Sequence, residues 1–432
     1  MQGCDWRMRR RWILQVVIVL TVACSGGAST WGGDTPSSWL DDAALHDVQF
    51  IGTKTGFAVG GHGAIWKSDD GGRAWKLLPS RTTGSLHSVC FLTDQVGWVA
   101  GRDAVPFAGL DAGVLLFTEN GGQSWRQLGQ QVLPGLSFVK FFGLEEGVVV
   151  GQPSALSPSG ILKTGDGGKS WQAVAGTVSH PWRAAAFVDR ELGVVAGHAG
   201  RLSLIGGEQL LASKLPPQGL RSIRAVAMQH DDNGWLAGDG GLVLKTSSGG
   251  VVWESPATLL PEELRQGIDF QAVEMRKGRV WLAGSPGSVI WHSPDGGKSW
   301  QQQSTGQTTP LHAVRFVSET HGVAVGDLGV ILRTENGGQS WQSVRGTDRR
   351  TAVLSLQSRP SQTASAWVAK LSGEQGYRSA VWIANRQDIG AASQSNDLDA
   401  RLSAAVERCG GNAAQIDWQL PEIGRASCRE RV

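Results

Sequence analysis

Apolar and polar positions alternate along most of the chain in short runs, and the same succession of runs returns many times. Each unit holds an apolar strand that ends in a bulky residue, a second strand of the form Gly-x-x-x-Gly, a third strand, and then Ser/Thr-x-Asp/Asn-Gly-Gly-x-x-Trp. Short alternating runs bounded by glycine turns are typical of antiparallel strands. The pattern therefore predicts a chain built almost wholly from short β-strands.

The Gly-x-x-x-Gly strand occurs seven times, at steps of 41, 50, 46, 41, 46 and 42 residues. The copies begin at Gly56, Gly97, Gly147, Gly193, Gly234, Val280 and Gly322. Four short strands every forty-odd residues, separated by glycine turns, are the signature of a β-propeller blade. The sequence thus predicts an all-β fold, a seven-bladed β-propeller of four-stranded blades over residues 45–346.

The Gly-Gly-x-x-Trp turn is predicted to be structural. An Asp, Asn or Ser at its start can accept hydrogen bonds from the turn's own N–H groups, the glycines supply positive φ angles, and the Trp is expected to pack between blades. The capping residues are Asp70, Asn120, Asp166, Ser248, Asp295 and Asn336, and the tryptophans are Trp75, Trp125, Trp171, Trp253, Trp300 and Trp341. The fourth unit has Gly206-Gly207-Glu208 without a Trp. We expect this blade to hold its outer strand loosely and to open first.

Composition changes the picture in two ways. With 41% hydrophobic residues the chain can bury a core, and 40 basic against 38 acidic side chains leave no basic excess of the kind that nucleic acid binding needs. Tyr377 is the only tyrosine and lies beyond the last unit, so a sialidase, which uses a tyrosine nucleophile, is not favoured. No metal-binding spacing, nucleophile elbow or phosphate loop is present, so we expect no enzyme, no cofactor and no metal.

The N-terminal residues predict export. Four arginines between positions 7 and 11 precede the apolar run Trp12–Ala23, which is typical of a signal peptide (residues 1–24) and short for a membrane span. Cys24 follows a lipobox-like stretch, so the expected location is either the periplasm or a lipid anchor on the outer side of the cytoplasmic membrane. Residues 25–44 are expected to be a linker. Cys90 and Cys409 are expected to be buried small apolar residues, not a disulfide.

The C-terminal residues follow another pattern. Residues 350–421 predict a partial α/β domain with a parallel sheet, its strands at 352–356 and 379–384 and its helices at 365–371 and 398–408. This order resembles the start of the N-acetylglucosaminyl deacetylase family, but Ser358-Arg359-Pro360-Ser361-Gln362 stands where that family has its His-Pro-Asp-Asp zinc motif. The resemblance therefore implies a domain that has lost activity. Residues 422–432 resemble a translated sequencing adapter, so a natural chain is expected to continue beyond Pro421.

The repeated unit resembles the Asp-box (BNR) repeat. Its combination of Leu-His-x-Val-x-Phe, Gly-x-Ala-Val-Gly, Gly-x-Ile-x-x-Thr/Ser and Asp-Gly-Gly-x-x-Trp resembles the photosystem II stability/assembly factor family over about residues 45–346. The resemblance implies an exported, non-enzymatic propeller that binds a protein partner, such as a membrane protein under assembly, and we expect a monomer. The alternative is an exported glycan-binding or glycoside-hydrolysing Asp-box propeller.

One candidate binding site follows from aligning the first strands. Seven polar residues occupy one equivalent position near the strand's start: His46, His87, Ser137, Arg183, Arg224, Gln271 and His312. In a propeller the first strand is innermost, so these side chains are expected to form a ring at one end of its centre. Either each one hydrogen-bonds a neighbouring blade's backbone, or Arg183 and Arg224 bind a carboxylate of the partner. In the second case the three histidines are expected to add attraction below about pH 6.5.

Overall fold

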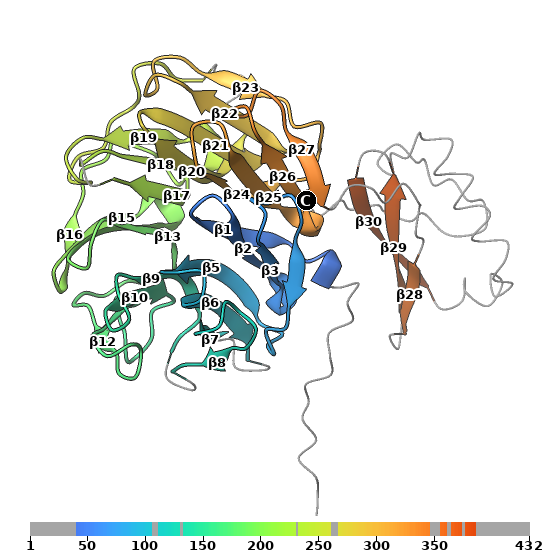
Figure 1. The fold of residues 1–432 in the computed structure, drawn as a ribbon, viewed down its shortest axis with the longest axis horizontal. Helices are drawn as coiled ribbons and strands as arrows, with labels where there is room; N and C mark the ends of the chain where they lie inside the picture. Colours follow the sequence, from blue (N-terminus) through green and yellow to red (C-terminus); the bar gives the residue numbers. More distant parts are fainter. Residues whose placement is uncertain are drawn as a thin grey trace, which may run out of the picture. The chain divides into compact units, whose positions relative to one another are not determined.

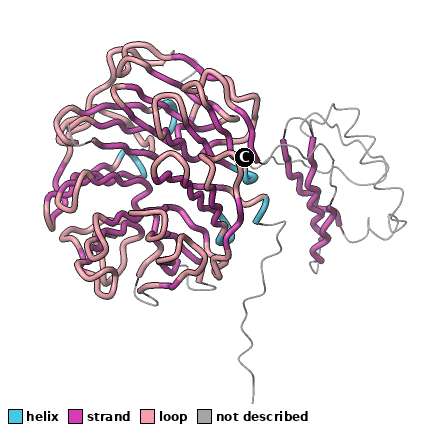
Figure 2. Tube along the Cα trace, viewed as in Figure 1, coloured by secondary structure: helices cyan, strands magenta, loops and turns pink. Residues whose placement is uncertain are grey.

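The computed structural model describes residues 40–105, 111–129, 133–229, 232–260 and 267–345, and the backbone of three later strands. The predicted seven-bladed propeller is confirmed: seven antiparallel sheets stand around a common centre (Figure 1). Strand and loop account for nearly all of this ring, apart from short helical turns (Figure 2). Each sheet is built from strands that follow one another along the chain.

The strands of the first three blades run outward from the centre in chain order. The first blade comprises β1 (Leu45–Ile51), β2 (Thr55–Gly60), β3 (Ile65–Ser68) and β4 (Lys76–Leu78). The second comprises β5 (Ser85–Phe91), β6 (Gly97–Ala104), β7 (Asp111–Thr118) and β8 (Arg126–Gln127). The third comprises β9 (Leu136–Phe141), β10 (Gly147–Gly151), β11 (Ile161–Thr164) and β12 (Gln172–Ala173).

The later blades repeat this order. The fourth comprises β13 (Trp182–Phe187), β14 (Leu192–Gly197), β15 (Leu202–Gly206) and β16 (Gln209–Ala212), and the fifth β17 (Ile223–Met228), β18 (Gly234–Gly238) and β19 (Val243–Thr246). The sixth comprises β20 (Asp269–Arg276), β21 (Arg279–Ser285), β22 (Val289–Ser293) and β23 (Gln301–Gln303). The seventh comprises β24 (Leu311–Phe316), β25 (Gly322–Gly326), β26 (Ile331–Thr334) and β27 (Gln342–Arg345). Short 3-10 turns follow the second strand at η1 (Gly61–Gly63), η2 (His198–Gly200), η3 (Asp239–Gly241) and η4 (Asp327–Gly329).

The two glycines of Gly-x-x-x-Gly make room for the first strand. A Cβ on the first glycine would lie 2.6 Å from the ring of Phe50 in the first blade, and the bulky end of the first strand fills the same place in other blades. A Cβ on the last glycine would lie 2.0 Å from a backbone oxygen at Gly60 and at Gly238. The motif therefore encodes close packing of β-strands within each blade, and does so without any ligand.

The first and seventh blades close the ring without exchanging a strand. A buried cluster joins side chains of both blades, among them Leu45 and Trp66 from the first and Val323 and Ile331 from the seventh. Arg345, at the end of the seventh blade, also contacts the start of the propeller. It forms an ion pair with Asp41 at 2.7 Å, and its guanidinium carbon lies 3.4 Å from the centre of the Trp66 ring in the first blade. Closure thus depends on contacts between side chains, both apolar packing and ion pairs such as that of Arg345, because the backbone ladders stay within each blade.

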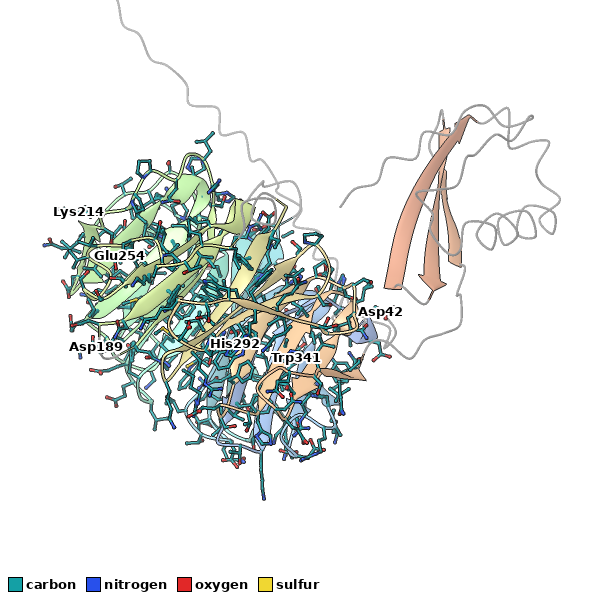
Figure 3. All side chains as sticks on the ribbon, turned by 90° about the horizontal axis from the view of Figure 1, so that it is seen from above. Asp42, Asp189, Lys214, Glu254, His292 and Trp341 are labelled. Carbon is teal, nitrogen blue, oxygen red and sulfur yellow. The ribbon has the colours of Figure 1, made fainter. Side chains whose placement is uncertain are left out.

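The fifth blade has three strands because of a proline. In the first blade Leu78, three residues after the box Trp, pairs with Ile65. The equivalent residue of the fifth blade is Pro256, which has no N–H to donate to Val243. Only the bridge between Lys245 and Glu254 remains, and the segment is also held by Lys214, whose backbone bonds Val251 and Trp253 (Lys214 and Glu254 are labelled in Figure 3).

The fourth blade keeps its outer strand although it lacks the box. Strand β16 forms a hairpin with β15, pairing from Gly206 with Gln209 to Ser203 with Ala212. Leu210 packs in the apolar cluster shared with the third blade, and Gln209 forms a bridge to Ala175 of that blade. These contacts replace the indole that the sequence lacks, so the expected looseness finds no support in the pairing.

We accordingly expect the amides of β16 to exchange with solvent as slowly as those of β27. The four residue pairs between β15 and β16 and the Leu210 contact have to be lost before this edge opens, and exchange reports the free energy of such local opening. Hydrogen exchange read by mass spectrometry on peptides covering residues 203–212 and 331–345 makes the comparison. Rapid exchange confined to β16 would restore the prediction made from the sequence.

The prediction of a parallel α/β domain is wrong for the part that the structure describes. Residues 365–371 lie in a strand, β29 (Ala364–Gly373), which pairs antiparallel with β28 (Ser355–Pro360) and β30 (Gly376–Asn385). The register sets Trp367 opposite Trp382 and Val368 opposite Val381. Trp367 and Val368 belong to residue types that are enriched in strands, and the prediction of a helix gave too much weight to the alanines beside them.

Several predictions fall outside the described residues: the signal peptide, Cys24, the linker up to residue 39, the helix at 398–408, Cys409 and residues 422–432. Cys90 lies in the described part of the chain, where it is buried, as expected, and has a free thiol. Within the described ranges, no helix is both long and apolar enough to cross a membrane.

Candidate functional site

The seven polar residues near the start of the innermost strands are placed as the alignment expects, and we call them the central polar ring: His46, His87, Ser137, Arg183, Arg224, Gln271 and His312. Neighbouring innermost strands contact one another all the way round, including β24 with β1. Residues at one equivalent height on these strands therefore meet near the centre of the ring. Two of the seven, His46 and Ser137, hydrogen-bond the backbone of the next blade, at Leu86 O (2.7 Å) and Trp182 O (3.0 Å).

The three histidines come together where the ring closes. The ring of His46 stacks on that of His87 with 4.7 Å between centroids and meets His312 edge-on at 5.8 Å. His312 also contacts Asp327 through Nε2 at 2.6 Å. Three imidazoles from the seventh, first and second blades thus form one cluster.

Burial makes two of these histidines harder to protonate than a histidine in water. Burial, followed by the neighbouring His46, lowers the pKa of His87 to about 3, and burial also lowers the pKa of His46. A buried imidazole close to other cations loses more by becoming charged than a solvated one. For His87 this argues against the expectation that the histidines add attraction below about pH 6.5, and for His46 the shift has the same direction.

The two arginines lie on adjacent blades and differ in their partners. The Nε of Arg183 donates to Nε2 of His198 at 2.8 Å. Arg224 forms an ion pair with Asp239 and extends NH1 toward Gln271 Oε1 at 3.4 Å. Partial burial, and then the positive charge of Arg224 on the adjacent blade, lower the pKa of Arg183.

A second ring of residues completes the site, and the alignment of first strands missed it. It consists of the residue that directly follows each Gly-x-x-x-Gly strand: Gly61, Arg102, Gln152, His198, Asp239, Ser285 and Asp327. His198, Asp239 and Asp327 each contact the central-ring residue fifteen positions earlier. The signal was present in the sequence, because six of these seven positions carry a polar side chain directly after an apolar strand.

The Asp-box turns use their polar groups internally. Asp70 Oδ1 accepts from the backbone N–H of Arg73 (2.8 Å) and Ala74 (3.0 Å), and Ser68 Oγ accepts from Gly72 N–H at 2.8 Å. In the sixth blade the hydroxyl of Ser299 donates to Asp295, and this bond with others lowers the pKa of that carboxyl to about 2. The box glycines have positive φ, for example 76° at Gly71.

The box tryptophans pack in the apolar clusters between blades. The clusters hold Trp75, Trp125, Trp171, Trp253, Trp300 and Trp341. The carboxylate and hydroxyl oxygens named above are bonded within their own turns, which supports a structural role for the boxes.

A third set of charges lies further along the innermost strands. Arg315 contacts Asp47 Oδ1 at 3.3 Å and Glu274 Oε2 at 3.8 Å, which joins the seventh, first and sixth blades. Both carboxylates are mostly buried, and burial raises the pKa of Glu274 to about 6. Asp47 also accepts from the N–H of Val89 in the second blade at 3.1 Å. These side chains bind the inner strands to one another.

The fold and the central ring define a class: a seven-bladed propeller whose polar residues converge at one end of its centre. In the described part of the chain, no group of three or more His, Cys, Asp or Glu side chains has the geometry to hold a metal ion. A family model described as "Photosynthesis system II assembly factor YCF48" matches residues 38–138 and 214–342, more than half of the chain. The chain belongs to this family.

Individual relatives agree with the family. The photosystem II assembly lipoprotein Ycf48 of Synechococcus sp. (strain CC9902) is 27% identical over 340 residues, covering 74% of this chain and 95% of the relative. The chloroplastic photosystem II stability/assembly factor HCF136 of Arabidopsis thaliana is 27% identical over 317 residues, covering 67% and 75%.

Solved structures share the fold. A structure described as YCF48 bound to D1 peptide has a TM-score of 0.54 at 22% identity and covers 68% of this chain and 92% of that one. The GH74 enzyme of Niastella koreensis reaches a TM-score of 0.55 at 14% identity over 80% of this chain and 64% of its own. At identities this low, the matches show that the propeller architecture is shared, and they carry no argument about activity.

Proposed function

We propose that this propeller is a non-enzymatic assembly factor that binds a membrane protein of photosystem II, D1 or a protein like it, while the photosystem is assembled. The observation that carries the proposal is the family match, which covers the first two blades (residues 38–138) and the last three (residues 214–342). The structure described as YCF48 bound to D1 peptide supports a protein partner. The glycan-directed alternative is not favoured, because relatives named for assembly cover most of this chain.

We further propose that the protein acts outside the cytoplasmic membrane, held there by a lipid on Cys24 or free after cleavage. The name of the Synechococcus relative, a lipoprotein, supports export with an anchor. We propose the central polar ring as the docking surface, since Arg183 and Arg224 hold equivalent positions on the adjacent strands β13 and β17, and guanidinium groups bind carboxylates through paired, charge-assisted hydrogen bonds.

Pull-down from the native membrane fraction tests the proposed partner and the proposed docking surface. The wild-type chain is expected to retain a photosystem protein, and the double variant Arg183→Ala/Arg224→Ala is expected to lose about tenfold or more of it, since each charge-assisted hydrogen bond contributes about 1.5–3 kcal/mol. Arg190→Ala is the matched control, because Arg190 lies in the same blade but forms its ion pairs with Glu146 and Glu191 outside the central ring. Undiminished capture by a folded double variant would remove the central ring as the docking surface.

A further inference from the structure

Arg183 and Arg224 occupy the same position in successive blades, yet their hydrogen-bond acceptors differ in charge. Arg224 donates to a carboxylate, Asp239, and so its positive charge is compensated inside the protein. Arg183 donates through Nε to Nε2 of His198, which accepts only when that nitrogen carries no proton. His198 and Asp239 are themselves equivalent, each being the first residue after the Gly-x-x-x-Gly strand.

His198 is fixed in place by the turn that carries it. Residues His198–Gly200 form η2, in which Arg201 N–H donates to His198 O at 3.1 Å and Gly197 N–H donates to Arg201 O at 2.9 Å. The charged groups that face its imidazole are Arg183, His180, Arg201 and Arg224, all basic. Burial, and then these four basic groups, lower the pKa of His198, which favours the neutral imidazole that can accept at Nε2.

A guanidinium held by a neutral acceptor keeps both its full charge and its two terminal nitrogens for a ligand. Among the described residues, no hydrogen-bond partner of NH1 or NH2 of Arg183 is found, and its side chain is exposed. We propose that His198 is the positioning residue of a carboxylate-binding site at Arg183. The same position carries a neutral histidine in the fourth blade and an aspartate, Asp239, in the fifth. Arg183 therefore binds the ligand, while the charge of Arg224 is compensated by Asp239. The inference rests on the proposed function for its ligand, a carboxylate of a protein partner.

Replacing His198, the hydrogen-bond acceptor of Arg183, tests the proposal. A D1 peptide is titrated into the full chain and its variants, with binding followed by calorimetry. His198→Asp copies the fifth blade, compensates Arg183, and is expected to weaken binding about tenfold or more, as Arg183→Ala does. His198→Gln supplies a neutral acceptor and is expected to bind within about threefold of the wild type.

Asp239→Asn is the matched counterpart in the fifth blade. It removes the carboxylate that compensates Arg224 and is expected to strengthen binding, because a second guanidinium then becomes free to bind a carboxylate of the peptide. Wild-type affinity in the His198→Asp variant, while Arg183→Ala binds weakly, would overturn the role given to His198. Equal losses in His198→Asp and His198→Gln would also overturn it, since a neutral acceptor would then not suffice.

A second readout separates this inference from the proposed function. If the wild-type chain does not bind the peptide, the proposed partner is wrong. Sodium acetate is then used as the probe. The side-chain ¹⁵Nε resonances of Arg183 and Arg224 are followed by NMR. Acetate is then expected to shift the Arg183 resonance in the wild type and in His198→Gln but not in His198→Asp. Equal responses of Arg183 and Arg224, or no response in the wild type, would refute the inference.

Discussion

Gly238→Ala is expected to destabilise the propeller by about 3 kcal/mol, the upper range for forcing extra atoms into a packed site. Its new Cβ would lie 2.0 Å from the carbonyl oxygen of Ser222, a backbone atom that cannot rotate away. The φ angle of Gly238 is −174°, an extended value open to any residue, so the cost comes from space alone. Urea unfolding of the full chain, followed by tryptophan fluorescence, measures the shift in midpoint.

The fourth blade offers the matched control. At the equivalent Gly197 an added Cβ would lie 3.0 Å from Pro181 O, because the backbones stand further apart there. We expect Gly197→Ala to cost about 1 kcal/mol, the lower range for such overpacking. Equal unfolding midpoints for the two variants would show that this close approach of the backbones is not the reason why the motif ends in glycine.

Arg315→Ala is expected to destabilise the propeller by about 2–3 kcal/mol. The change leaves Asp47 and Glu274 without the cation that lies between them, and removing one partner of a buried ion pair costs about 3–5 kcal/mol. Because the Arg315 side chain is 38% exposed, water screens part of this loss. The control is Arg190→Ala, whose ion pairs are exposed and contribute about 0–1 kcal/mol.

The loss should depend on pH in a defined direction. The pKa of Glu274, already raised by burial to about 6, and that of Asp47, also raised by burial, are expected to rise further without Arg315. The folded variant then binds more protons than its unfolded chain, so its stability falls as the pH rises. The difference between variant and wild type is therefore expected to be larger at pH 7.5 than at pH 5. A difference that stays constant over this range would contradict the assigned contact.

Part of the candidate site could be predicted because it repeats with the blade. The central polar ring follows from alignment, since one position per first strand meets its equivalents wherever seven strands surround one centre. The charge state of that ring could not be predicted in the same way. Whether His87 or Arg183 has a compensating neighbour depends on side chains of other blades and on burial, and neither quantity is local in sequence.

The sequence by itself determined the elements that close over a few residues: the seven units, the box turns with their capping oxygens, and the strand glycines. The capping hydrogen bonds of the turns and the close approaches of the strand glycines lie within one blade, so the local pattern specifies them. Only the tertiary structure decided the closure of the ring through Arg345, the pairing of β29 as a strand, and the contrast between His198 and Asp239. Each of these depends on which surfaces meet in space, because burial and neighbouring charge act through distance and not through position along the chain.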